Sequence, residues 1–224
     1  EDTVITAARG RRRTLEVPRA TSVVDRETIA ERLPQTTPDA LSEEVGVVIQ
    51  KTNQGGGSPI IRGRSGKSIL LLLDGLRFNN STFRRNNQYL NTLDLAAVDR
   101  LEVVRGPASV LYGSDAIGGV VNIITKTPTG EGFTGTGSYL FGSVESQNRV
   151  SARASGRTGA FSIQVGGMWR EPGSYEAPAG SFGDITLTDV VSVENSGVED
   201  QTMDMRLGWD FGPSTGVFAK VENY

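Results

Sequence analysis

Apolar and polar residues alternate strictly in five stretches along the second half of the chain. In each stretch every second side chain is apolar, and the side chains between them are polar or charged. This period of two predicts β-strands that each have one apolar and one polar face. The stretches are 133–141, 147–155, 160–170, 202–211 and 217–221.

Two kinds of sheet fit this alternation. A strand of about ten residues is long enough to cross a bilayer at a tilt, with its apolar face toward lipid. A soluble sandwich alternates in the same way, with its apolar face turned inward. Arginine and aspartate occur in mid-strand on the polar faces, so we expect these faces to meet water or polar protein. The alternation alone does not decide which face looks outward.

A different pattern runs through the first half, where short apolar runs are bounded by glycine and proline. The stretch 98–126 predicts two strands with a short helix between them. Its paired glycines, Gly118 and Gly119, predict backbones that pack too closely for side chains. We therefore expect a small compact core here rather than a catalytic loop. Its predicted elements are the strand 101–104, the helix 108–112 with Gly113 at its end, and the strand 120–125.

Short helices, strands and polar loops are predicted before this core. Asp25 is suited to cap a helix that Pro34 ends, and Thr37 to cap a second one. Asp74 and Gly75 fit a tight hairpin turn. The predicted helices are 26–33 and 37–44, and the predicted strands are 47–50, 60–63, 68–73 and 76–78.

The composition excludes several classes of function. The 224 residues include no cysteine and no histidine, which removes disulfides, most zinc sites and Ser-His-Asp triads. A net charge of −3 gives no overall drive toward nucleic acid. The basic cluster at 9–13 has no interleaved aromatic residues, so a solvated tail is a better interpretation than a nucleic-acid site. No base–nucleophile pair stands out, and we do not expect an enzyme.

Three further features of the sequence bear on a membrane location: its first residue, its longest apolar run and the number of residues after Lys126. A start at Glu1 is expected for a mature protein that has lost its signal peptide. The longest apolar run, 68–73, is far too short for a spanning helix. A barrel wide enough to hold a plug needs roughly 22 strands. Too few residues follow Lys126 for that number, so we expect about the first five strands of a longer protein.

Two loops are candidates for binding. Residues 79–92 are dense in amides and include two arginines and two aromatics, which suits a polar or anionic ligand. A solvated connection is the equally open alternative for this loop. Residues 171–201 are rich in carboxylates, so calcium is a candidate ligand there, against an ordinary acidic loop. The candidate calcium ligands are Asp184, Asp189 and Asp200.

Several motifs in the first 128 residues resemble, in order, the plug of TonB-dependent outer-membrane receptors. They are Ile-Arg-Gly at 61–63, Leu-Leu-Leu-Asp-Gly at 71–75, Glu-Val-Val-Arg-Gly-Pro at 102–107, Leu-Tyr-Gly at 111–113 and Ala-Ile-Gly-Gly-Val-Val-Asn-Ile-Ile-Thr at 116–125. Residues 2–7 are similar to the TonB box, which the periplasmic protein TonB pairs with as a strand and pulls. Without the resemblance, these residues would be read as a frayed terminus.

The resemblance implies a fold and a location. The fold is an α+β plug domain, a small mixed sheet with short helices, followed by antiparallel transmembrane β-barrel strands, with the barrel incomplete in this chain. The implied domains are 1–14 (TonB box and periplasmic linker), 15–128 (plug) and 129–224 (about the first five strands of the barrel). The implied location is the outer membrane of a Gram-negative bacterium, with the plug in the barrel lumen. Outer-membrane lipid and lipopolysaccharide are then expected contacts, and nucleic acid is not.

The resemblance also implies site residues. The loops 51–59 and 79–91 would face outward and bind the solute. Arg62 and Arg105 would pair with barrel carboxylates, with an ion pair inside the plug as the alternative. The TonB-binding residues would be Asp2, Thr3, Val4, Ile5, Thr6 and Ala7. The solute-binding residues would be Asn53, Gln54, Ser58, Asn79, Asn80, Phe83, Arg84, Arg85, Asn87 and Tyr89.

The implied function is TonB-dependent uptake of a scarce small-molecule solute, with no required cofactor. An iron chelate, or iron taken from haem or an iron-carrying protein, is the first expectation. Cobalamin or another nutrient is the alternative, since residues 112–125 also resemble the plug of the cobalamin transporter. A surface-binding or assembly protein of the same fold, without transport, is the rival class. The lack of histidine argues against a haem ligand on the plug.

Overall fold

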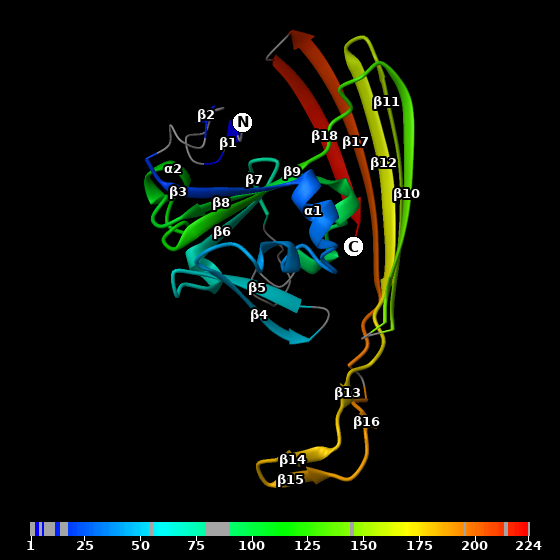
Figure 1. Ribbon diagram of the computed structural model, residues 1–224. Helices are drawn as coiled ribbons and strands as arrows, with labels where there is room; N and C mark the ends of the chain where they lie inside the picture. Colours follow the sequence, from blue (N-terminus) through cyan, green and yellow to red (C-terminus); the bar gives the residue numbers. More distant parts are fainter. Residues whose placement is uncertain are drawn as a thin grey trace. The chain divides into compact units, whose positions relative to one another are not determined.

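The computed structural model describes residues 3–4, 6, 12–13, 18–53, 56–78, 90–143, 146–194, 196–212 and 215–223. The chain divides into two compact units. One comprises residues 1–52 and 56–127, here called the N-terminal unit, and the other residues 53–55 and 128–224, the C-terminal unit (Figure 1). Within the described ranges, no helix is both long and apolar enough to span a membrane.

A five-stranded mixed sheet forms the centre of the N-terminal unit. Its strand order is β3-β8-β9-β6-β7, in which β6 and β9 run parallel and the other neighbours antiparallel. The outer strand β3 was not predicted from the sequence. The strands are β3 (Ala20–Asp25), β6 (Ile69–Leu73), β7 (Leu76–Arg77), β8 (Val98–Arg105) and β9 (Gly119–Thr125). Two smaller ladders join β1 (Thr3–Val4) to β2 (Arg12–Arg13) and β4 (Val47–Asn53) to β5 (Gly56–Ile61).

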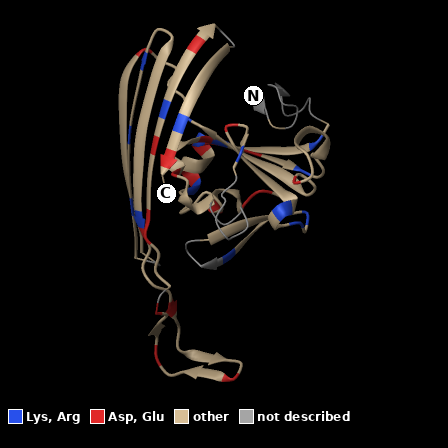
Figure 2. Ribbon diagram, turned by 180° about the vertical axis from the view of Figure 1, so that it is seen from behind, with Lys and Arg blue, Asp and Glu red and all other residues tan. Residues whose placement is uncertain are grey.

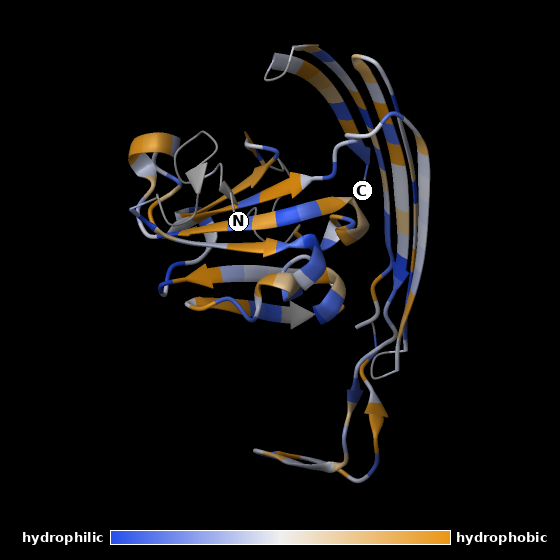
Figure 3. Cartoon of the chain, turned by 45° about the horizontal axis from the view of Figure 1, so that its top comes forward, coloured by the Kyte–Doolittle hydropathy of each residue, from blue (hydrophilic) through white to orange (hydrophobic). Residues whose placement is uncertain are grey.

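The apolar core of this unit lies on both faces of the central strands. Val103 and Val121 lie on one face of β8 and β9, and Val104 and Val120 lie on the other; each is at most 1% exposed. Figure 3 shows the strands of this unit as orange stretches interrupted by blue ones. Burial on both faces explains why the sequence shows continuous apolar runs here instead of alternation.

The helices of this unit agree only partly with the sequence. Helix α1 (Arg26–Arg32) begins as predicted, because the Asp25 carboxylate accepts a 2.8 Å hydrogen bond from Thr28 N, which also holds the pKa of Asp25 below its ordinary value. The predicted helix 37–44 is wrong in type: only the 3₁₀ turn η2 (Asp39–Leu41) forms. The Asp39 carboxylate accepts hydrogen bonds from both N and Oγ1 of Thr36, and the following turns close through i→i+3 bonds.

The short elements around the paired glycines match the prediction of close packing. Helix α2 (Ser109–Tyr112) ends at Gly113, which has a φ of 86°. A Cβ on Gly118 would lie 2.6 Å from Cβ of Arg64, and a Cβ on Gly119 would lie 2.6 Å from the carbonyl oxygen of Val104. Any side chain here would displace backbone or the base of a neighbouring side chain. Further 3₁₀ turns are η3 (Gly66–Ser68) and η5 (Leu95–Ala97).

The C-terminal unit contains a five-stranded antiparallel sheet, which confirms the five predicted strands. The order β10-β11-β12-β17-β18 follows the sequence. Its strands are β10 (Gly132–Gly142), β11 (Gln147–Thr158), β12 (Phe161–Glu171), β17 (Asp200–Gly212) and β18 (Thr215–Asn223). The chain between β12 and β17 forms two small ladders, β13 (Glu176–Ala177) with β16 (Val191–Ser192) and β14 (Gly180–Phe182) with β15 (Ile185–Leu187).

The apolar face of this sheet is the exposed one. Phe133 is 79% exposed, Met203 72% and Trp209 57%. On the opposite face arginines pair with aspartates across the strands, visible as blue and red bands in Figure 2. The alternation therefore places the apolar side chains outward, which is the arrangement of a strand facing lipid and not that of a soluble sandwich.

Candidate functional site

Thr6, in the segment that resembles a TonB box, is bound to the centre of the N-terminal unit. Its backbone N and its Oγ1 donate hydrogen bonds of 2.8 and 2.7 Å to the same carboxylate oxygen of Glu102. Asn122 Nδ2 donates to Thr6 Oγ1 at 2.8 Å, and the Tyr112 hydroxyl donates to the Thr6 carbonyl at 2.7 Å. We call Glu102, Tyr112 and Asn122 the Thr6 cradle.

The cradle is built on the two central strands of the sheet. Glu102 of β8 and Asn122 of β9 are direct cross-strand partners. The Glu102 side chain is fully buried, Asn122 is 2% exposed and Thr6 is 1% exposed. The second carboxylate oxygen of Glu102 accepts from Arg100 Nε at 2.9 Å, so the buried charge is paired as well as hydrogen-bonded.

Two residues of the cradle, Asn122 and Tyr112, also make hydrogen bonds to the hairpin β6–β7. Asn122 Oδ1 accepts a 3.1 Å hydrogen bond from Gly75 N in the turn of that hairpin. The carbonyl of Tyr112 accepts from the Arg77 guanidinium, whose other nitrogen donates to Asp115 at 2.5 Å. The arrangement can hold a chain segment reversibly, because it consists of hydrogen bonds to one residue. It contains no nucleophile with an adjacent base.

Sequence reasoning missed all three cradle residues as partners of the N-terminal segment. A signal was present: Glu102 and Asn122 are polar residues inside apolar runs, and buried polar groups need partners. What the sequence does not show is that the partner lies 96 and 116 positions away.

The other predicted site residues are divided between the described ranges and the rest of the chain. Thr3 and Val4 form β1, Asn53 ends β4, and Ser58 is a half-buried residue of β5. Outside the described residues lie Asp2, Ile5, Ala7, Gln54, Asn79, Asn80, Phe83, Arg84, Arg85, Asn87 and Tyr89. Their roles stay predictions.

The two predicted plug arginines have different surroundings. Arg105 Nη2 lies 3.6 Å from Glu44 and donates to Ser22 Oγ at 2.8 Å. Burial lowers the pKa of Arg105, with Glu44 opposing that shift and Arg62 adding to it. Arg62 is exposed and, among the residues with described positions, has no carboxylate within ion-pair distance.

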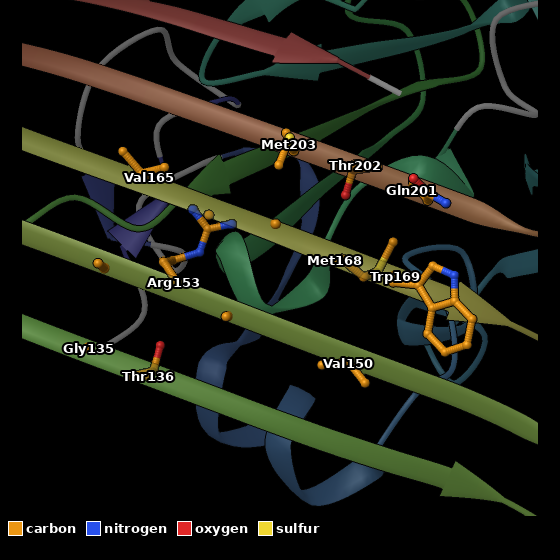
Figure 4. A pocket seen from close by; sticks show the side chains of 14 residues that line it. Gly135, Thr136, Val150, Arg153, Val165, Met168, Trp169, Gln201, Thr202 and Met203 are labelled. Carbon is orange, nitrogen blue, oxygen red and sulfur yellow. The ribbon is translucent and has the colours of Figure 1, made fainter.

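The C-terminal unit carries a hollow whose lining does not suit a polar ligand. A hollow of 780 Å³ on its sheet is lined mainly by small and apolar residues, and Figure 4 shows Val150, Trp169 and Met203 around it. In the described part of the chain, no three acidic side chains are grouped to hold a metal ion. Asp200 is paired with Arg170. Calcium at Asp184, Asp189 and Asp200 stays a prediction.

Comparison with known proteins assigns the N-terminal unit. Residues 13–120 match the family model of the TonB-dependent receptor plug domain. The iron-regulated outer membrane virulence protein of Vibrio cholerae is 32% identical over 212 residues, which cover 87% of this chain and 31% of that protein. The vitamin B12 transporter BtuB of Vibrio cholerae is 34% identical over 170 residues, covering 74% of this chain and 27% of the transporter.

A solved structure shows the same relationship. The ferric enterobactin receptor PfeA of Pseudomonas aeruginosa is 27% identical, with a TM-score of 0.64, and the match covers 90% of this chain and 32% of the receptor. The chain spans about a third of the length of the relatives it matches. The match runs through both units, so the antiparallel strands correspond to the part of such a receptor that follows its plug. The chain belongs to the TonB-dependent outer-membrane receptors, a family of transporters rather than enzymes.

Proposed function

We propose that this chain is the N-terminal part of a receptor that takes up a scarce solute across the outer membrane, driven by TonB. The observation that carries the proposal is the Thr6 cradle. It binds the segment that resembles a TonB box to the two central strands of the plug through buried hydrogen bonds. A pull on this segment is therefore delivered to the centre of the plug sheet and not to a free tail.

TonB would recognise residues 2–7 by pairing with them as an added strand. Among the described residues of this segment, Thr3 and Val4 pair as a short strand within the chain, with Arg13 and Arg12. So short a ladder is easily exchanged for a longer one with a partner.

The proposed solute is an iron chelate, or iron derived from haem or an iron-carrying protein. Support comes from two relatives, the iron-regulated outer membrane virulence protein and the ferric enterobactin receptor. Cobalamin is the second candidate, because a vitamin B12 transporter is 34% identical. We place solute binding in the outward loops 51–59 and 79–91.

Contacts with the rest of the receptor and with the membrane follow from exposure and charge. Arg62 is the better candidate for an ion pair with a barrel carboxylate, because Arg105 already faces Glu44. The exposed apolar face of the C-terminal unit would contact outer-membrane lipid and lipopolysaccharide.

Deletion of residues 2–7 from the full-length receptor tests the proposal. Cells that depend on this receptor would be offered radiolabelled ferric enterobactin, haemin and cyanocobalamin separately. We expect energised uptake of one probe to be lost on deletion while binding of that probe to the cells is retained. Uptake that survives the deletion contradicts TonB dependence. Binding without uptake in the intact receptor would instead favour a surface-binding protein.

A further inference from the structure

The Thr6 cradle shares two of its residues with the hairpin β6–β7, and this arrangement forms a relay. We infer that the position of this hairpin controls the release of Thr6, through Asn122 on one side and Tyr112 on the other. The inference deepens the proposed function, on which it rests, by naming the residues that would regulate access to the TonB-binding segment.

The first connection runs through the single carboxamide of Asn122. Its Nδ2 donates to Thr6 Oγ1 at 2.8 Å, while its Oδ1 accepts from Gly75 N at 3.1 Å. Because the side chain is 2% exposed, a rotation that breaks either bond leaves a buried polar group without its partner. The carboxamide therefore favours keeping both bonds or losing both.

The second connection runs through Tyr112 at the end of helix α2. Its hydroxyl donates to the Thr6 carbonyl at 2.7 Å, and its own carbonyl accepts from Arg77 in β7. Arg77 also donates to Asp115 at 2.5 Å, which ties the strand to the turn that follows α2. A displacement of β7 would thus move the backbone that carries the Tyr112 ring.

The hairpin turn is itself anchored to β9, the strand that carries Asn122. The Asp74 carboxylate accepts hydrogen bonds from N and Oγ1 of Thr125 at 2.8 and 2.7 Å, and Asp74 N donates to the Ile123 carbonyl at 2.8 Å. These bonds fix the Asp74 end of the turn to β9, and Asp74 itself has a φ of 51°. A shift of the turn is transmitted to β9 instead of being absorbed.

The position of the hairpin in the chain gives the relay its role. Strand β7 ends at Arg77, two residues before the loop 79–91 that we propose for solute binding. A change in the hold on Thr6 would therefore reach the hairpin, two residues before this loop begins. Coupling of this kind is reciprocal, so a displacement of the hairpin would also loosen the hold on Thr6.

The test uses the full-length receptor with a single reporter cysteine, Ala7→Cys. Residues 1–224 contain no cysteine that would compete, and any cysteine elsewhere in the receptor would be replaced by serine. The rate of reaction with a water-soluble maleimide reports the release of the segment. We expect Tyr112→Phe, which removes only the donor to the Thr6 carbonyl, to raise this rate about three- to tenfold. Thr6→Val should raise it similarly, and Thr6→Ser should leave it unchanged.

The decisive variant is Arg77→Ala, which touches neither Thr6 nor its direct partners' side chains. We expect it to raise the labelling rate at position 7 in the wild-type background and to add little in the Tyr112→Phe background, because the two changes break one connection. Arg26→Ala, in an exposed ion pair of the same unit, is the matched control and should have no effect. Since Arg77 is 43% exposed, the variant leaves the core intact.

An unchanged labelling rate in Arg77→Ala, or an increase that simply adds to that of Tyr112→Phe, would overturn the relay. This failure is separate from a failure of the proposed function. If deletion of residues 2–7 abolishes uptake while Arg77→Ala has no effect on labelling, only the relay is lost.

Discussion

The two units bury opposite kinds of side chain, although both are built around five-stranded sheets. In the N-terminal unit the central strands are apolar on both faces, and the few polar groups inside, such as Glu102 and Asn122, bind another part of the chain. In the C-terminal unit the apolar side chains are exposed, and cross-strand ion pairs occupy the other face.

This difference shows what the hydrophobic pattern means in each setting. Continuous apolar runs with isolated polar residues are typical of a core that is buried within protein, where each polar residue has a specific partner. Strict alternation with mid-strand charges belongs to a sheet whose apolar side requires no protein partner, because lipid can cover it. The predictions below test whether equivalent substitutions have different consequences in the two units.

The largest difference is expected for a pair of truncations, Leu101→Ala and Met203→Ala. Leu101 is fully buried, so its truncation should lower the free energy of unfolding of the N-terminal unit by about 3–4 kcal/mol. Met203 is 72% exposed, and its truncation should change stability in detergent by less than about 0.5 kcal/mol. Hydrogen exchange of the amides in β8 and β9 measures the first. Equal effects would contradict the different roles of the apolar residues.

The next largest effect concerns the ion pairs. Asp204→Ala removes two hydrogen bonds, of 2.8 and 2.6 Å, from Arg153, whose side chain is 5% exposed. Breaking a buried pair of this kind should destabilise the C-terminal unit by about 3 kcal/mol. Trp169 and Trp209, the two tryptophans of the chain, both lie in this unit, so their fluorescence reports its unfolding.

Asp99→Ala is the matched control for that experiment. It breaks the ion pair with Arg26, whose side chain is 61% exposed. We expect it to lower the free energy of unfolding of the N-terminal unit by less than about 1 kcal/mol, as measured by hydrogen exchange. A control effect as large as that of Asp204→Ala would show that the charges of the C-terminal unit have no special role.

Much of this architecture could be predicted from local patterns. The five alternating strands, the cap of α1 at Asp25 and the close packing at Gly118 and Gly119 each depend on the identity and spacing of nearby residues. These are the features that hydrogen-bond geometry and steric exclusion fix within a few positions.

The features that sequence reasoning missed depend on distant contacts. Strand β3 forms because Ala20–Asp25 pairs with β8, nearly eighty positions further on. The predicted helix 37–44 is replaced by 3₁₀ turns in a segment whose Thr37 hydroxyl donates to the carbonyl of Leu93, 56 positions away. The Thr6 cradle was missed for the same reason, since Glu102, Tyr112 and Asn122 lie 96, 106 and 116 positions from Thr6.

A smaller effect is expected at the glycines of the two sheets. A Cβ on Gly119 would lie 2.6 Å from the Val104 carbonyl, so Gly119→Ala should destabilise the N-terminal unit by about 2 kcal/mol. On Gly137, a Cβ would have nothing nearer than 4.0 Å, so Gly137→Ala should be close to neutral. Hydrogen exchange in β8 and β9 measures the first change and tryptophan fluorescence the second. Similar losses in both would show that backbone freedom, and not close packing, keeps glycine at these positions.

The smallest effect is expected at the N-terminus of helix α1. Asp25→Ala removes the carboxylate that accepts from Thr28 N, and should lower stability by about 1 kcal/mol at neutral pH. The pKa of Asp25 is lowered in the folded state, so its contribution is present above the ordinary aspartate pKa and is lost as the pH falls from about 4 through the lowered value. Asp25→Asn keeps a capping oxygen without this titration. Its stability should therefore depend less on pH than that of the wild type in the same range, when followed by hydrogen exchange in the N-terminal unit. A steeper dependence in Asp25→Asn would show that the carboxylate is not stabilised by the helix end.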